Sequence, residues 1–222
     1  MPSIMVHKVS PTLTDDAQYK NFTDIPTTAL ASGSVVELYP GTHDAIQSSN
    51  LTGITLTGVG GPDRVIIKSV QLPDGATGVA SFENMTIGTG ADTVPVANIV
   101  GITTTATIHM KDVVINTGAA TAPAALANHG TGHFILRNVN FEDDNGLAPT
   151  AVSSVWSNGA GNILEFCSIN STSTNQALGG VAGTTTYRIS SVFNTGAGGC
   201  NTGGVVTTVS ANLFPTVGSA DM

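Results

Sequence analysis

The clearest candidates for chemistry are three consecutive carboxylates, Glu142, Asp143 and Asp144, which follow Arg137 closely in the chain. Several carboxylate oxygens on a flexible loop suit a hard cation such as Ca²⁺. However, consecutive residues of an extended chain point in alternating directions, so these three converge on one ion only through a special turn. An Asn-Gly turn signal follows them directly. We therefore expect a solvated loop here, with a calcium site as the alternative.

Histidine gives a weaker signal for metal binding. His129 and His133 are four residues apart, but glycines in ALANHGTGHF argue against the helix that would place both imidazoles on one face. His109 stands beside the apolar Met110 and is expected to point outward from a strand. The sequence thus predicts neither a metal site nor a cofactor.

A recurring apolar cassette supplies the elements that would hold these residues. It reads SFENMTI, HMKDVVI, ILRNVNF and LEFCSI, then more loosely YRISSVF and TVSANLF, at intervals of 21 to 28 residues. Alternate positions are apolar, as in a strand that buries one face, so we predict a core ladder. The ladder consists of Phe82, Met110, Leu136 and Leu164, then Ile87, Ile115, Phe141 and Ile169 five positions later, with looser copies ending at Phe193 and Phe214.

The middle of each cassette is predicted to be a bend. Asn84, Asp112 and Asn138 stand there, and the fourth copy has Phe166 instead. Asn and Asp tolerate left-handed backbone angles better than other residues with a side chain, which suits a bend between two strands. A repeat built of short strands buries its apolar face only by stacking on its neighbours. We therefore predict an all-β fold, a right-handed parallel β-helix formed by a single chain.

These residues resemble the pectate-lyase-like β-helix superfamily, in which stacked asparagines at one bend form an internal ladder. Asn84, Asp112 and Asn138 occupy the matching positions. The segment DIPTTALASGSVVELYPGTHDAI is similar to the first, capped coil of such proteins, so the resemblance covers roughly residues 24 to 214. It implies architecture more than activity, because one fold carries many unrelated functions.

The resemblance also raises two enzyme mechanisms. Related lyases hold calcium with aspartates beside a basic residue that removes a proton, which here would be Arg137 with Glu142, Asp143 and Asp144. Related hydrolases pair carboxylates on neighbouring coils. The outward charges Glu83, Lys111, Arg137 and Glu165 offer only two carboxylates, three coil spacings or about 14 Å apart. An inverting pair needs about 6.5–9.5 Å, so we interpret this row as an ion-pair ladder and expect no enzyme.

Composition excludes several functions. The net charge of −8 and the scattered Lys and Arg residues argue against nucleic-acid binding. No apolar run is long enough to predict a membrane span. Only 10% of the 222 residues are charged, against about 25% in ordinary domains. Long uncharged surfaces of this kind favour burial against other subunits.

The N-terminal residues lack the repeat pattern. We predict that residues 1–23 form an arm that anchors a partner and that residues 24–222 form one β-helix domain. The N-terminus has no charged start and apolar centre, so no secretory signal is predicted. The expected location is a virus particle assembled from protein made in the host cytoplasm.

The favoured hypothesis is a non-enzymatic structural protein of a bacteriophage virion, a capsid-decorating subunit that forms a homotrimer and attaches through its arm to the major capsid protein or another virion protein. It rests on the analogy that phage virion proteins often use this fold. Two alternatives stay open. One is a tail fibre or tailspike that binds a receptor, and the other is a small calcium-dependent polysaccharide lyase.

Overall fold

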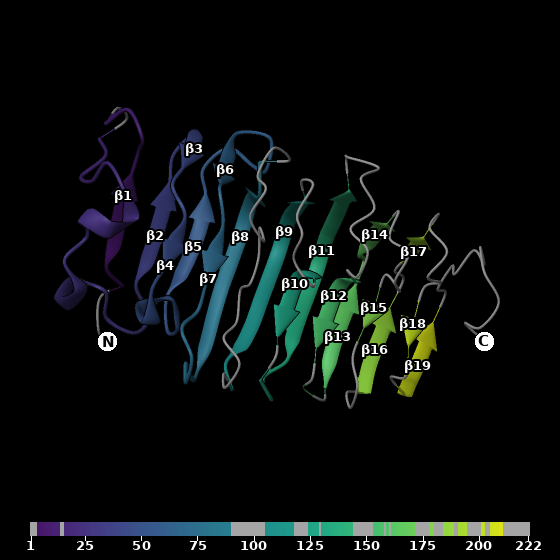
Figure 1. Cartoon of the computed structure of the whole chain (residues 1–222). Coiled ribbons are helices and arrows are strands. Elements are labelled where there is room, and N and C mark those ends of the chain that lie inside the picture. Colours follow the sequence, from purple (N-terminus) through teal and green to yellow (C-terminus); the bar gives the residue numbers. More distant parts are fainter. Residues whose placement is uncertain are drawn as a thin grey trace.

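Parallel strands stacked along one axis form the whole described structure, a computed structural model of the 222-residue chain (Figure 1). The main sheet has 13 strands. Nine of them follow one another in the order β1-β2-β5-β8-β9-β11-β13-β16-β19, and every pair between them is parallel. The other four, β3, β6, β14 and β17, also pair in parallel. A second sheet has the order β10-β12-β15-β18, and a third pairs β4 with β7. The chain is therefore a parallel β-helix, as predicted. The structure describes residues 4–13, 16–89, 105–117, 124–128, 130–143, 153–157, 159, 161–171, 178–179, 184–188, 191–194, 201–202 and 205–210.

Most strands are short, but three are long because each continues through the cassette bend, where only the bend residue is unpaired and pairing resumes in the same register. These are β8 (Val79–Ile87), β9 (Thr107–Thr117) and β11 (Phe134–Asp143). The others are β1 (Val6–Val9), β2 (Val35–Leu38), β3 (Gly41–His43), β4 (Ile46–Gln47), β5 (Thr55–Gly58), β6 (Val65–Ile67), β7 (Val70–Gln71), β10 (Ala124–Asn128), β12 (Ser153–Ser157), β13 (Asn162–Glu165), β14 (Ser168–Ser171), β15 (Leu178–Gly179), β16 (Thr184–Arg188), β17 (Ser191–Asn194), β18 (Asn201–Thr202) and β19 (Val205–Ser210).

The predicted core ladder is confirmed in the first four copies. Phe82, Met110, Leu136 and Leu164 lie in register on successive strands, and each is at most 1% exposed. Beyond the bend, Ile87, Ile115 and Phe141 form a second buried row, and Ile169 continues its register. Stacking of like side chains at each coil gives one continuous core along the axis.

The predicted bend is also confirmed. Asn84, Asp112 and Asn138 have φ of 57°, 54° and 52°, in the left-handed region. Phe166 has the same conformation with φ of 56° although its residue type is unfavourable there, and its side chain is 55% exposed. The fold thus imposes the bend even where the sequence does not favour it.

The expectation of an internal asparagine ladder is wrong. Asn138 is exposed and Asp112 is half-buried, and the Nδ2 of Asn138 donates a 2.6 Å hydrogen bond to the Oδ1 of Asp112 at the surface. The physical reason is the left-handed conformation of the bend residue Asn138, which follows the exposed Arg137 and precedes the buried Val139 while its own side chain stays at the surface. The hydrogen-bonded side chains of Asp112 and Asn138 therefore lie on the outer surface of the bend.

The placement of residues 1–23 outside the coil stack is wrong as well. β1 pairs with β2 in parallel register from Val6↔Val35 to Val9↔Leu38, so it forms the first strand of the main sheet (Figure 1). Val9 is fully buried, and Phe22 and Ile25 cover the end of the core. Residues 1–23 and 24–222 are thus not separate units. The partner-anchoring role of this end stays a prediction.

The cassette pattern is absent from the N-terminal end because that end is a cap. His7 occupies the core column in register with Val36, and its Nε2 lies 3.0 Å from the carbonyl oxygen of Ala29. The covering chain includes the short 3-10 helices Phe22–Asp24 and Thr27–Ala29, which have no strand periodicity. Capping protects the edge of β1, whose Lys8 carbonyl accepts hydrogen bonds from the backbone of residues 18 and 19.

The fifth cassette copy was aligned one residue too far along the chain. Ile169 pairs with Val192 rather than Phe193, and Leu164 pairs with Tyr187. A shift of one residue moves every side chain of a strand to the opposite face. The sequence pattern was ambiguous here because Tyr187, Val192 and Phe193 are all apolar, so the pattern fits an alignment on Val192 as well as one on Phe193. The sixth copy, ending at Phe214, lies outside the described residues.

Candidate functional site

A column of charged residues runs along the outer surface of the main sheet, one coil above another. The predicted stack of Glu83, Lys111, Arg137 and Glu165 is confirmed by the strand register. Three coil spacings separate Glu83 from Glu165. Pairing extends the column in both directions to residues that the sequence analysis missed, because their coils lack a clear cassette. These are Lys8, Glu37 and Thr57 on one side and Arg188 on the other.

Only part of this column forms the ion pairs that we expected. The Nε of Arg137 donates a 3.0 Å hydrogen bond to the Oε2 of Glu165, and these side chains are 60% and 20% exposed. Lys111 lies 4.0 Å from Asp112 on its own strand and forms no ion pair with Glu83. Lys111 and Arg137 therefore lie between Glu83 and Glu165 in the column. Of these two carboxylates, Glu165 forms an ion pair with the basic residue beside it and Glu83 does not.

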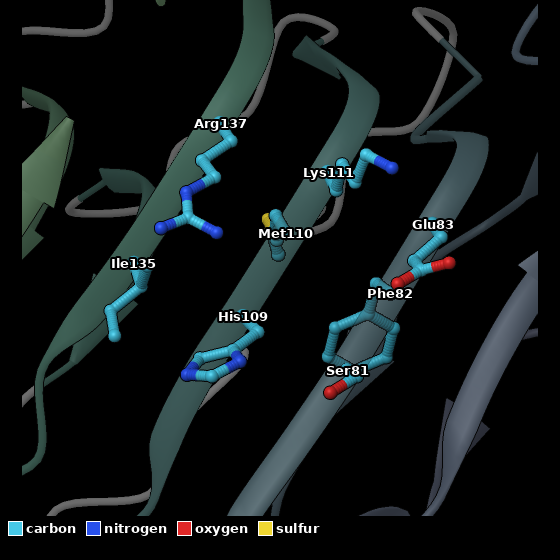
Figure 2. A pocket seen from close by; sticks show the side chains of 8 residues that line it. All are labelled: Ser81, Phe82, Glu83, His109, Met110, Lys111, Ile135 and Arg137. Atoms are coloured by element: carbon cyan, nitrogen blue, oxygen red, sulfur yellow. The ribbon is translucent and has the colours of Figure 1, made fainter. Parts of the chain in front are cut away.

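A shallow pocket of about 100 Å³ opens over these rows, on the outer face of β8, β9 and β11 before the bend. Figure 2 shows its polar groups: the amine of Lys111 extends toward β8 and Glu83, whereas the guanidinium of Arg137 lies over the gap toward His109. The lining residues are Ser81, Phe82, Glu83, His109, Met110, Lys111, Ile135 and Arg137.

His109 lines this pocket with a side chain that can gain or lose a proton. Its pKa is lowered, first by partial burial and then by the positive charges of Arg137 and His133. The outward orientation predicted for His109 is confirmed by its register with Ser81 and Ile135. Although a serine and a histidine face each other across β8 and β9, no hydrogen bond joins them.

Two of the three residues in the acidic segment Glu142, Asp143 and Asp144 belong to a strand. Glu142 and Asp143 are the last residues of β11, in register with Asn116 and Thr117, so the prediction of a loop is wrong for these two residues. Asp144 lies outside the described residues. Arg137, the proposed basic partner, lies on the other side of the bend and binds Glu165. Within the described part of the chain, no three His, Cys, Asp or Glu side chains gather in a way that could hold a metal ion.

The outer surface beyond the bend has a different character. There Ile66, Thr86, Val114, Asn140 and Ser168 follow one another in register, and none of them carries a charge. All five are half-buried. This column agrees with the long uncharged surface that the composition predicts.

Exposed apolar side chains concentrate at the N-terminal end of the coil stack. Ile4, Met5, Val6 and Leu13 are 69%, 41%, 44% and 56% exposed. Among the described residues, the other large exposed apolar side chains are Val79 and Phe166, each on a different coil. A single exposed apolar residue needs no explanation. These four side chains all belong to the first coil, with Ile4, Met5 and Val6 at or just before the start of β1 and Leu13 beyond its other end.

No protein family, curated protein or solved structure matches this chain. Its structural class therefore rests on its own fold, which is a parallel β-helix with a capped N-terminal coil. The described residues include no helix long and apolar enough to cross a membrane.

Proposed function

We propose that this protein is a non-enzymatic structural subunit of a bacteriophage virion, in which it decorates the capsid as a homotrimer. The observation that carries the proposal is the N-terminal coil, where Ile4 and Met5 before β1 and Leu13 after it are all exposed. A coil stack with an apolar end suits attachment end-on to another protein. The remaining surface would then project from the particle.

The uncharged column beyond the bend supports the homotrimer. Thr86, Val114 and Asn140 present flat, half-buried side chains at successive coils, and identical subunits could bury this face without desolvating a charge. The proposal thus assigns the two surfaces separate contacts. The N-terminal end contacts the shell, and the uncharged column contacts the neighbouring subunits.

The N-terminal surface is tested by changing its side chains rather than by deleting them. Removing residues 1–20 would remove β1 together with Val9, so the deletion would disturb the core and could not report on attachment alone. The triple variant Ile4→Ser, Met5→Ser, Leu13→Ser leaves β1 intact. A matched control is Val79→Ser with Phe166→Ser, which removes exposed apolar side chains elsewhere.

The measurement is co-sedimentation of purified protein with phage particles produced without its gene, alongside mass spectrometry of complete particles. We expect the chain in complete particles, binding by wild type and control, and loss of binding by the triple variant. Absence of the chain from purified particles would refute the virion role. Equal binding by the triple variant would refute the assignment of the N-terminal end.

The two alternatives predict other results. A tail fibre or tailspike would label the tail rather than the head when gold-conjugated antibody is imaged by electron microscopy. A lyase would release unsaturated products from uronic-acid polymers in the presence of calcium, and Arg137→Gln would abolish that activity.

A further inference from the structure

The pocket on β8, β9 and β11 gathers positive charge in a protein that is otherwise acidic. The net charge is −8 with only seven Lys and Arg residues, yet two of these, Lys111 and Arg137, line this one pocket with His109. A fourth basic group, His133, is close enough to affect the pKa of His109. Structural roles explain little of this grouping, because like charges on adjacent strands repel one another.

Hydrogen-bond donors remain available on the β9–β11 side of the pocket. A guanidinium has five N–H donors, and Arg137 uses its Nε for Glu165. Its terminal amino groups form no hydrogen bond within the described residues, and Figure 2 shows them over the gap that His109 and Ile135 also border. A guanidinium fork beside an imidazole is suited to the oxygens of one small anion.

Acidic residues limit how far an anion could extend. Glu83 is one row before Lys111 and Glu165 is one row after Arg137, so a polyanion lying along the axis would meet a carboxylate at both ends of the basic pair. Asp112 lies beside Lys111 in the same way. A single charged group could bind between these carboxylates, whereas a long acidic polymer or a nucleic acid would be repelled.

We propose that the β9–β11 side of this pocket binds one phosphate or sulfate group, with Arg137 and His109 as direct donors and Lys111 as a supporting charge. The apolar side chain of Ile135 forms one wall, which reduces the water around the anion and strengthens charge-assisted hydrogen bonds. This site is independent of the proposed virion role.

Binding and protonation of His109 are linked. The groups that face this imidazole are Arg137 and His133 from the β11 side, Ser81 and Glu83 from β8, and Lys111 on β9. Burial and the neighbouring cations favour the neutral ring, which has one N–H donor. A bound anion favours the cationic ring, which has two, so it raises the pKa of His109 and binds more tightly as the pH falls.

The test is an NMR titration of the histidine ring resonances with sodium sulfate, at constant ionic strength maintained with chloride. Sulfate is the first probe because it does not titrate near neutral pH. We expect a saturable shift of the His109 resonance and a raised His109 pKa, with the resonances of His7 and His43 unchanged. Inorganic phosphate should act similarly, and acetate should bind at least tenfold more weakly.

Variants separate a site from general salt effects. Arg137→Gln should weaken sulfate binding at least tenfold, whereas Glu165→Gln should strengthen it severalfold by releasing the guanidinium. Lys68→Gln is the control, because Lys68 is also an exposed cation in an ion pair, with Asp44 at 2.8 Å. The proposal is overturned by a shift that grows linearly with salt, by equal shifts in Arg137→Gln, or by equal binding of acetate.

Discussion

The two halves of each long strand, before and after the left-handed bend, have the same interior and different exteriors. Inside, Phe82 and Ile87 of β8 are equally buried, and so are their partners on the next two coils. Outside, the first half presents the charged column with its pocket, and the second half presents the uncharged column. The inward positions therefore specify the β-helix, whereas the outward positions of the two halves form two surfaces of different character, one charged and one uncharged.

The largest effect is expected from a charge on the inner face. Leu136→Asp should abolish cooperative folding, at a cost of more than about 4 kcal/mol, because no partner for a carboxylate exists between Met110 and Leu164. Ile135→Asp changes the adjacent, outward residue and should leave a folded protein. Circular dichroism with urea unfolding compares the two, and cooperative unfolding of Leu136→Asp would refute the inward register.

A smaller but substantial loss is expected where a coil approaches the bend of the next one. A Cβ on Gly58 would collide with the backbone carbonyl of Asn84. Gly58→Ala should therefore destabilise the fold by about 1–3 kcal/mol or more, since the backbone must move. Thr57→Ala, on the outer face of the same strand, is the control. Equal urea midpoints for the two variants would show that the bend does not pack against Gly58.

Acid should weaken the half of the core beyond the bend through His43. This side chain is 5% exposed, in register with Ile67, and burial lowers its pKa below the usual 6.5. The unfolded state therefore binds more protons at acidic pH, so stability falls as the pH drops through about 6.5. His43→Gln should flatten unfolding midpoints measured between pH 8 and 5. An unchanged pH dependence in that variant would assign the acid sensitivity to other groups.

The smallest effect concerns the bend itself. Phe166 has the left-handed conformation at φ of 56°, where Asn138 of the previous coil has φ of 52°. Phe166→Asn should stabilise the protein by roughly 1 kcal/mol, because it relieves backbone strain at an exposed position. The reverse change, Asn138→Phe, should destabilise by a similar amount. Thermal unfolding measures both, and a loss of stability in Phe166→Asn would mean that the aromatic ring makes a contact that outweighs the strain.

The sequence predicted the fold well wherever one coil resembles the next. Phe82, Met110 and Leu136 could be aligned because a buried strand requires an apolar residue at every second position, and Asn84 and Asp112 marked the bend through their backbone preference. Phe166 was recognised as an exception in residue type, but its retained bend was not predictable, because stacking on Asn138 imposes that conformation.

The candidate sites were predicted less well, for a physical reason. An outer surface has no required residue type, so the extension of the charged column to Lys8, Glu37 and Arg188 and the pocket around His109 become visible only when the coils are placed in register. Strand β1 was missed because His7 replaces an apolar residue in the core column. The acidic segment was read as a loop, although Glu142 and Asp143 continue β11.

The central claim is that the uncharged column beyond the bend joins identical subunits, and the most direct test is the mass in solution by light scattering. The account predicts three times the chain mass of 22.4 kDa, and a monomer for Val114→Glu, which places a charge in that column. Ile135→Glu, on the charged half of the next strand, should remain a trimer. A wild-type monomer, whether or not it cleaves uronic-acid polymers with calcium, would contradict the claim.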